Sequence, residues 1–226
     1  MKGAIILVES KKNTLLAKAI KFFTGRLAKK YRVKSYTHAM FCVGEVLGEP
    51  SVFSAEASMT IMPLRKFTNR DFEYDVYAIN DDLSDKEVDK ILRAIYIKTA
   101  GETYGFLQLL WFIYRWFMEL IGFDVRKQKN WFPIGDVCSE HTYRYLKTRL
   151  LKKKNRKIIS KTLSQLEEWN ENTFHPVDLA KVIKDNPQLF IHFCGYKDDT
   201  VVFLPGYNCS KTYKFDFDKD CNRDET

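Results

Sequence analysis

Residues 136–146 read DVCSEHTYRYL and place a cysteine where a helix is expected to begin. Asp136 can accept hydrogen bonds from the first turn, and the amphipathic run after it predicts a helix to about Leu151. Cys138 would then lie in that first turn, where unpaired main-chain N–H groups favour negative charge. The cysteine is compatible with three roles: a small buried side chain, a metal ligand, or a nucleophile.

A nucleophilic role for Cys138 requires a partner. A free cysteine with a pKa of about 8.5 is only about 3% thiolate at pH 7. The helix dipole contributes about 0.3–1 kcal/mol, whereas lowering the pKa by about one unit takes about 1.4 kcal/mol. A histidine would supply the remainder and would also carry the proton. The chain contains His38, His141, His175 and His192.

The composition indicates a globular protein in a reducing compartment. The 226 residues are 45% hydrophobic and 15% aromatic, which is enough for a substantial core, and the net charge is +8. Five scattered cysteines without C-x-x-C spacing argue against a disulfide framework. The N-terminal apolar run GAIILV is too short for a secretory signal and predicts a strand. We therefore expect a cytoplasmic protein, or one delivered without a signal peptide, for example in a virus particle.

Strands and helices are segregated along the chain, which favours the α+β class. Alternating or apolar runs predict strands at 4–9, 36–47, 51–58 and 74–79, and a hairpin at 189–205. Helical periodicity predicts helices at 13–25, 84–101, 104–121, 138–151 and 176–185. We expect residues 1–185 to form one domain, and residues 186–226 to form a small β-hairpin extension with an acidic tail.

Local signals set the expected helix ends. Gly25 is expected to stop the first helix, and Ser84 with Glu87 forms a capping box at the start of the second. Pro176 suits the first turn of the last helix.

The segment GFLQLLWFIYRWFMELIG, residues 105–122, is the most apolar in the chain. Gln108, Arg115 and Glu119 interrupt it, and it is short for a membrane span. A buried helix is the first interpretation, and a helix lying on a membrane surface is the second.

A zinc site is an alternative role for Cys138. His38-x3-Cys42 and Cys138-x2-His141 together provide four ligands of the kind that zinc prefers. If residues 36–47 form a strand, however, positions 38 and 42 lie roughly 13 Å apart. One ion would not reach both side chains without a bend in the backbone, so we expect no bound metal.

Three motifs resemble a known family. The segments SYTHAMFCVGE (35–45), FSAEAS (53–58) and DVCSEHTYRYL are similar, in order and spacing, to the circularly permuted papain-fold hydrolases of the NlpC-like superfamily. The opening segment 3–25 and AGETYGF (100–106) are similar to further elements of that family. The resemblance covers roughly residues 3–185. It implies a permuted papain-like fold, with an antiparallel sheet packed against helices.

The resemblance assigns a role to each matching position. Cys138 would be the nucleophile, His38 the general base, and Glu56 the group that orients the imidazole. Tyr104 would bind substrate at the wall of the active site. The implied enzyme is a cysteine peptidase or amidase that works through an acyl-enzyme and needs no cofactor. Its substrate would be a peptide or acyl compound, with cell-wall peptides the first choice and lipid acyl hydrolysis or acyl transfer the second.

A basic run leaves a non-catalytic class open. Residues 147–161, KTRLLKKKNRKIISK, hold eight Lys or Arg and no acid. They are consistent with a solvated helix end, since cations suit the helix C-terminus. They are also consistent with an anion-binding module that contacts an anionic polymer or a membrane surface. Aromatic residues are absent from the run, so specific nucleic-acid recognition is not indicated.

Overall fold

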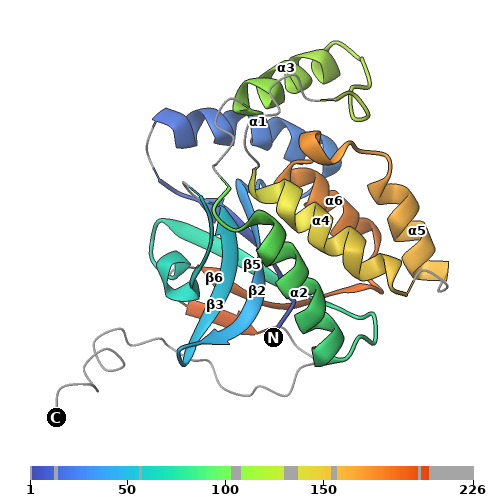
Figure 1. Ribbon diagram of the computed structural model, residues 1–226. Coiled ribbons are helices and arrows are strands. Elements are labelled where there is room, and N and C mark those ends of the chain that lie inside the picture. Colours follow the sequence, from blue (N-terminus) through green and yellow to red (C-terminus); the bar gives the residue numbers. More distant parts are fainter. Residues whose placement is uncertain are drawn as a thin grey trace.

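The computed structural model describes residues 2–12, 15–55, 58–102, 108–129, 137–153, 157–197 and 200–203. Within these ranges seven strands form one antiparallel sheet in the order β4-β3-β2-β1-β5-β6-β7 (Figure 1). The strands are β1 (Ile5–Ser10), β2 (His38–Val46), β3 (Glu49–Ala55), β4 (Met59–Pro63), β5 (Phe72–Ile79), β6 (Phe190–Lys197) and β7 (Thr200–Phe203). The fold is therefore α+β, as the sequence predicts.

Six α-helices accompany the sheet in the described ranges. They are α1 (Leu15–Tyr31), α2 (Asp85–Thr99), α3 (Gln108–Leu120), α4 (Cys138–Leu151), α5 (Lys157–Leu166) and α6 (Pro176–Asp185). Two short 3-10 helices, η1 (Leu64–Phe67) and η2 (Glu171–Thr173), complete the set. In Figure 1, α2 and α4 lie against the sheet, and α3 lies farthest from it, next to α1.

Strict alternation along the strands separates two apolar layers. Ile5 and Leu7 of β1 and Phe41 of β2 point toward the helices and join a core that includes Cys138. Their neighbours in sequence point to the other face of the sheet, where a second cluster forms around Phe67 of η1. Because side chains alternate with a period of two, the parity of a residue number along one strand decides which layer it enters.

Several expected helix boundaries are confirmed. Ser84 caps α2, and the side chain of Glu87 accepts from the Ser84 N–H at 2.9 Å. Pro176 occupies the first turn of α6. The expected stop at Gly25 is wrong, since α1 continues to Tyr31. One glycine within a helix costs only about 1 kcal/mol, and the buried Leu27 and Ala28 beyond it pack on Val177 of α6.

The C-terminal hairpin forms as expected, but it is not an extension. Strand β6 pairs with β5 along most of its length, from Tyr74↔Tyr196 to Ile79↔Phe190. Phe190 belongs to the helix-side core, while Cys194 and Tyr196 belong to the opposite layer. A boundary at residues 185/186 therefore cuts through one sheet and one core. The acidic tail lies beyond residue 203, outside the described part of the chain.

Helix α3 is attached to α6 by a buried ion pair. Arg115 is fully buried and donates two hydrogen bonds to the carboxylate of Asp178, at 2.7 and 3.0 Å. It also donates to Glu119 at 2.7 Å and to the Thr173 carbonyl at 2.6 Å. Burial alone would lower the pKa of Arg115, but Asp178 raises it overall. In the described ranges, no helix has the length and apolarity needed to cross a membrane.

Candidate active site

Cys138 is the first residue of α4, and it is 4% exposed. The N-cap position belongs to Val137, whose side chain offers no acceptor, and the predicted cap Asp136 lies in a stretch that is not described. The carboxylate of Glu140 accepts from the Val137 N–H at 3.0 Å, which supports the entry to the helix. Ser139 fixes the same turn by donating to the Phe174 carbonyl at 2.5 Å.

Main-chain amides surround the thiol. The N–H groups of Cys138 itself, Ser139 and Ala39 all act to lower the pKa of the Cys138 thiol. The first two belong to the open end of α4, and Ala39 belongs to the neighbouring strand β2, which packs against α4. Burial outweighs them and raises the pKa to about 11. The thiol is therefore protonated at neutral pH, but donors for a negative charge are already in place beside it.

His38 opens β2, and its ring lies among different neighbours. Its Nε2 atom is 2.7 Å from the Ser54 hydroxyl, and its ring stacks on Phe67 with centroids 6.0 Å apart. Burial lowers the pKa of His38 to about 4, so the imidazole is neutral at pH 7. The hydrogen that joins His38 and Ser54 belongs to one atom or the other according to the tautomer.

The sheet separates the His38 ring from the Cys138 thiol. His38 and Met40 are two residues apart on β2 and point to the same face of the sheet, where Met40 joins the layer around Phe67. Ala39 and Cys138 lie in the helix-side core. The main chain at the start of β2 thus reaches the thiol, but the imidazole points to the opposite face. Among the described residues, the polar contact of this ring is with Ser54.

The two remaining predicted site residues are not described. Glu56 and Tyr104 both fall in the gaps of the described ranges, at 56–57 and 103–107. Their roles stay predictions. Ser54, which the sequence did not single out, contacts the imidazole from β3. A serine two positions before Glu56 on an alternating strand is the signal that could have suggested it.

His141 is the histidine that shares a layer with Cys138. It lies one turn further along α4, is 2% exposed, and meets Phe53 edge-to-face with centroids 5.9 Å apart. Side chains on a helix lean toward its N-terminus, so the ring leans toward the turn that holds Cys138.

The other two histidines have structural partners. His175 is the N-cap of α6, and its Nδ1 atom accepts from the Val177 N–H at 3.1 Å. His192 on β6 is 3.0 Å from the carboxylate of Asp75 and stacks on Tyr77. Neither arrangement leaves the ring directed at Cys138.

All four ligands of the alternative zinc site lie in the described ranges. His38 and Cys42 lie on one strand, and Cys138 and His141 lie on one helix. Within the described ranges, no three His, Cys, Asp or Glu side chains are grouped as metal ligands.

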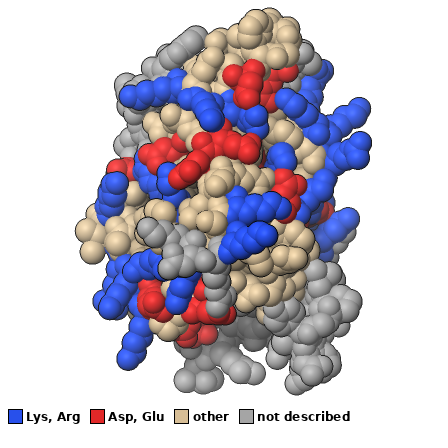
Figure 2. All heavy atoms as spheres, turned by 90° about the vertical axis from the view of Figure 1, so that its right-hand side faces the viewer, with Lys and Arg blue, Asp and Glu red and all other residues tan. Residues whose placement is uncertain are grey.

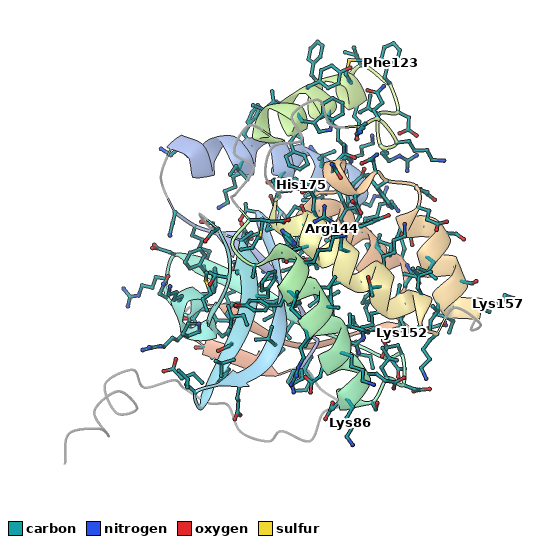
Figure 3. All side chains as sticks on the ribbon, viewed as in Figure 1. Lys86, Phe123, Arg144, Lys152, Lys157 and His175 are labelled. Atoms are coloured by element: carbon teal, nitrogen blue, oxygen red, sulfur yellow. The ribbon has the colours of Figure 1, made fainter. Side chains whose placement is uncertain are left out.

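The basic run 147–161 is not a single helix end. It spans the last turns of α4 and the start of α5. Arg149 is buried and bonds to Asp81, to the Tyr145 hydroxyl and to the Gly3 carbonyl at 2.8 Å. Lys152 and Lys157 lie on the right-hand side of the molecule in Figure 3, above Lys86 of α2. The surface of the helical layer carries basic and acidic side chains side by side (Figure 2), so the run does not present eight cations to one partner.

A scan against models of known protein families finds no match to this chain, and a search of curated proteins finds no similar sequence.

Proposed function

We propose that the protein is a cysteine hydrolase that cleaves an amide bond through an acyl-enzyme on Cys138. The observation that carries the proposal is the place of Cys138, the first residue of α4, where α4 packs against β2. The N–H groups of Cys138, Ser139 and Ala39 act to lower the pKa of its thiol, in line with this place. Donors in this position stabilise a thiolate, and they equally stabilise the oxyanion that forms when sulfur attacks a carbonyl. The resemblance to permuted papain-fold hydrolases supports the same assignment.

The chemistry follows the ordinary course of thiol hydrolases. The thiol proton passes to an imidazole as the S–C bond forms, and the carbonyl oxygen takes the negative charge. The imidazolium then gives this proton to the leaving amine, and the C–N bond breaks. Water attacks the resulting thioester with the imidazole again as the base, which releases the acid and restores the thiol. The Cys138 thiol is protonated and the His38 imidazole is neutral at pH 7, which are the protonation states from which this transfer starts.

Two histidines are candidates for the base. The resemblance assigns His38, oriented by Glu56, and the amide of the next residue, Ala39, is beside the thiol. For His38 to act, its ring must leave Ser54 and reach the helix side of the sheet. His141 needs no such rearrangement, because it shares the helix-side layer with Cys138. The hydrolase proposal therefore keeps His38 as the predicted base and treats His141 as its direct competitor.

The substrate class rests on the resemblance alone. A peptide amide, with cell-wall peptides first, is the proposed substrate, and Tyr104 is the proposed substrate-binding residue. Lipid acyl hydrolysis or acyl transfer on the same thiol is the alternative reaction. We also retain the proposal of a cytoplasmic protein, or one delivered without a signal peptide.

The test uses a second cysteine that matches Cys138 in its exposed fraction and in its raised thiol pKa but lies elsewhere in the fold. Cys194 is also 4% exposed, and burial also raises its pKa to about 11, but it lies within strand β6. The native protein is incubated with p-nitrophenyl acetate at pH 7, and acetylated cysteines are mapped by mass spectrometry. Acetylation of Cys138 well above that of Cys194 supports the proposal. Equal modification of the two overturns it.

Variants of the two histidines identify the base. His38→Ala and His141→Ala are compared for the acetylation rate of Cys138, with the thermal stability of each variant measured in parallel. A loss of rate in His38→Ala alone supports the predicted pair. A loss in His141→Ala alone moves the base to α4. If neither changes the rate, the site lacks a histidine base, and the non-catalytic anion-binding module becomes the better proposal.

A further inference from the structure

Helix α3 buries charged side chains on its inner face, next to the apolar Trp111 and Phe112. The usual surface helix turns apolar side chains inward and charged ones outward. In α3 the buried face contains Arg115, which is fully buried, and Glu119, whose side chain is 5% exposed. Both charges are satisfied internally, by Asp178 of α6 and by Lys30 of α1 at 3.2 Å. Buried ion pairs therefore attach the helix to the body of the protein, together with the buried rings of Trp111 and Phe112.

The outer face of α3 is apolar. Ile113, Phe117 and Ile121 recur every four residues and are 38%, 52% and 52% exposed. Phe123, just after the helix, is 59% exposed and points away from the body at the top of the molecule (Figure 3). Single exposed apolar residues are ordinary, but four on one stripe form a patch of the kind that marks an interaction surface. We call Ile113, Phe117, Ile121 and Phe123 the α3 stripe.

Exposed lysines lie in the segments next to the α3 stripe. Lys127 and Lys129 are exposed in the segment that follows Phe123. Lys29, also exposed, stands beside Lys30, whose ion pair with Glu119 brings the end of α1 next to α3. Figure 2 shows uncharged surface at the top of the molecule, with Asp or Glu side chains directly below it and Lys and Arg side chains to either side. The exposed acid of this segment, Asp124, is bonded to Arg126 at 2.7 Å.

We infer that the α3 stripe docks on the surface of an anionic lipid membrane. An apolar stripe bordered by lysines is complementary to acyl chains below a layer of anionic headgroups. A second copy of this chain is a poorer occupant, because a symmetric contact would bring two rims of Lys29, Lys127 and Lys129 together. The inference does not depend on the hydrolase activity, since it uses none of the residues near Cys138.

Vesicle binding tests the inference on the full chain. The protein is sedimented with phosphatidylcholine vesicles that contain about 30 mol% phosphatidylglycerol, and with phosphatidylcholine vesicles alone. We expect binding to the anionic vesicles that is stronger than binding to the neutral ones. Phe117→Ser with Phe123→Ser should weaken the anionic binding by roughly tenfold or more, since each change removes a large apolar side chain. Lys127→Gln with Lys129→Gln should weaken it by roughly fivefold per lysine at low salt.

Matched substitutions on other surfaces control for nonspecific binding to vesicles. Ile97 of α2 is 81% exposed, so Ile97→Ser removes a comparable apolar group from another surface. Lys152→Gln with Lys153→Gln removes the same charge from the other end of the helical layer. Both controls should bind anionic vesicles as the parent does. The inference is overturned if the control variants lose as much affinity for anionic vesicles as the α3 variants, or if the parent protein does not bind them. It is also overturned if Phe117→Ser instead dissociates a dimer in sedimentation velocity.

Discussion

Helices α4 and α6 share one capping interaction, a carboxylate (Glu140 or Asp178) that accepts from the N-cap N–H, but their N-cap side chains differ. At α6 the N-cap is His175, whose Nδ1 accepts from the Val177 N–H, while Asp178 accepts from the His175 N–H at 2.9 Å. At α4 the N-cap is Val137, which has no side-chain acceptor, and the amides of Cys138 and Ser139 act on the thiol instead. One helix start is closed by its own side chains, and the other is open to an anion.

The difference separates stabilising residues from candidate functional ones. A helix start that satisfies its amides internally contributes to stability but cannot bind an incoming charge. A start that leaves amides for a ligand or an intermediate gives up part of that stability. The same residue type, a buried histidine, has a capping role at α6 and a candidate catalytic role near α4. Type and burial alone therefore do not identify a catalytic histidine in this chain.

The largest expected effect is at the closed helix start. Asp178→Asn removes one of the two carboxylates that bond to the fully buried Arg115 and leaves Glu119. Breaking a buried ion pair by removing one partner costs about 3–5 kcal/mol. We expect a loss of this order in the free energy of unfolding, measured by urea titration. Asp124→Asn is the matched control, because the Asp124–Arg126 pair is largely exposed and should contribute below about 1 kcal/mol. Similar losses in the two variants would show that burying the Arg115 ion pair does not increase its contribution to the free energy of unfolding.

The second effect is a pH dependence. Burial, reinforced by the charge of Arg115 and opposed by that of Glu119, lowers the pKa of His175 to about 3. The unfolded chain binds a proton near pH 6.5 and the folded chain does not, so stability is fully present above pH 6.5 and falls as the pH falls toward 3. The expected loss from this group is about 2 kcal/mol at pH 5.

Asn is a suitable replacement for His175 because its side-chain oxygen also caps a helix. His175→Asn should retain most of the stability at pH 7 and flatten its decline between pH 6.5 and 4. Urea midpoints across this range make the comparison. His38, whose pKa burial lowers to about 4, adds a similar slope that stays in the variant. A slope identical to that of the parent would show that His175 does not titrate in this way.

Most of the fold follows from local patterns in the sequence. The capping box at Ser84 and the proline at the start of α6 are local rules, and the structure confirms both. The predicted strands are present, with boundaries that shift by a few residues. Strand β4 and helix α5 were missed. The basic residues around Lys157 obscured the helical spacing of Ile159, Leu163 and Leu166, all of which are buried.

The candidate site could be predicted less well, because it depends on which layer a side chain enters. The sequence placed Cys138 at a helix start and His38 in a strand, and both elements are confirmed; the strand begins at His38 itself. It did not indicate which face of β2 packs against the helices. The face that carries Ala39 does, and His38 lies on the other face with Met40. That choice depends on the pairing of β2 with β1 and on the docking of α4, which are non-local.

A smaller effect is expected from a substitution that gives α4 an N-cap acceptor. Val137→Thr keeps the shape of the side chain and adds a hydroxyl that can accept from the amide of Ser139 or Glu140. We expect a stabilisation of below about 1 kcal/mol, because burying the hydroxyl offsets part of the new hydrogen bond. Acetylation of Cys138 should slow, since the hydroxyl competes with sulfur for the Ser139 amide. Val137→Ala, which adds no acceptor, is the control, and a similar rate change in both would rule out competition for the amide.

The smallest expected effect is at the other end of α4. Lys152 occupies the C-cap position and is exposed, so its charge faces the negative end of the helix dipole through water. Lys152→Gln with Lys153→Gln should cost below about 0.5 kcal/mol in the free energy of unfolding at low salt. The cost should vanish at about 1 M salt, where the screening length is about 3 Å. Arg149→Gln, three residues earlier, is the contrast: it breaks the buried pair with Asp81 and should cost several times more at either salt concentration. If Lys152→Gln with Lys153→Gln proves as costly as Arg149→Gln, exposed charges contribute more to this helix than its buried pair predicts. The helix would then act on the Cys138 thiol through the charges along its whole length, rather than through the N–H groups at its first turn.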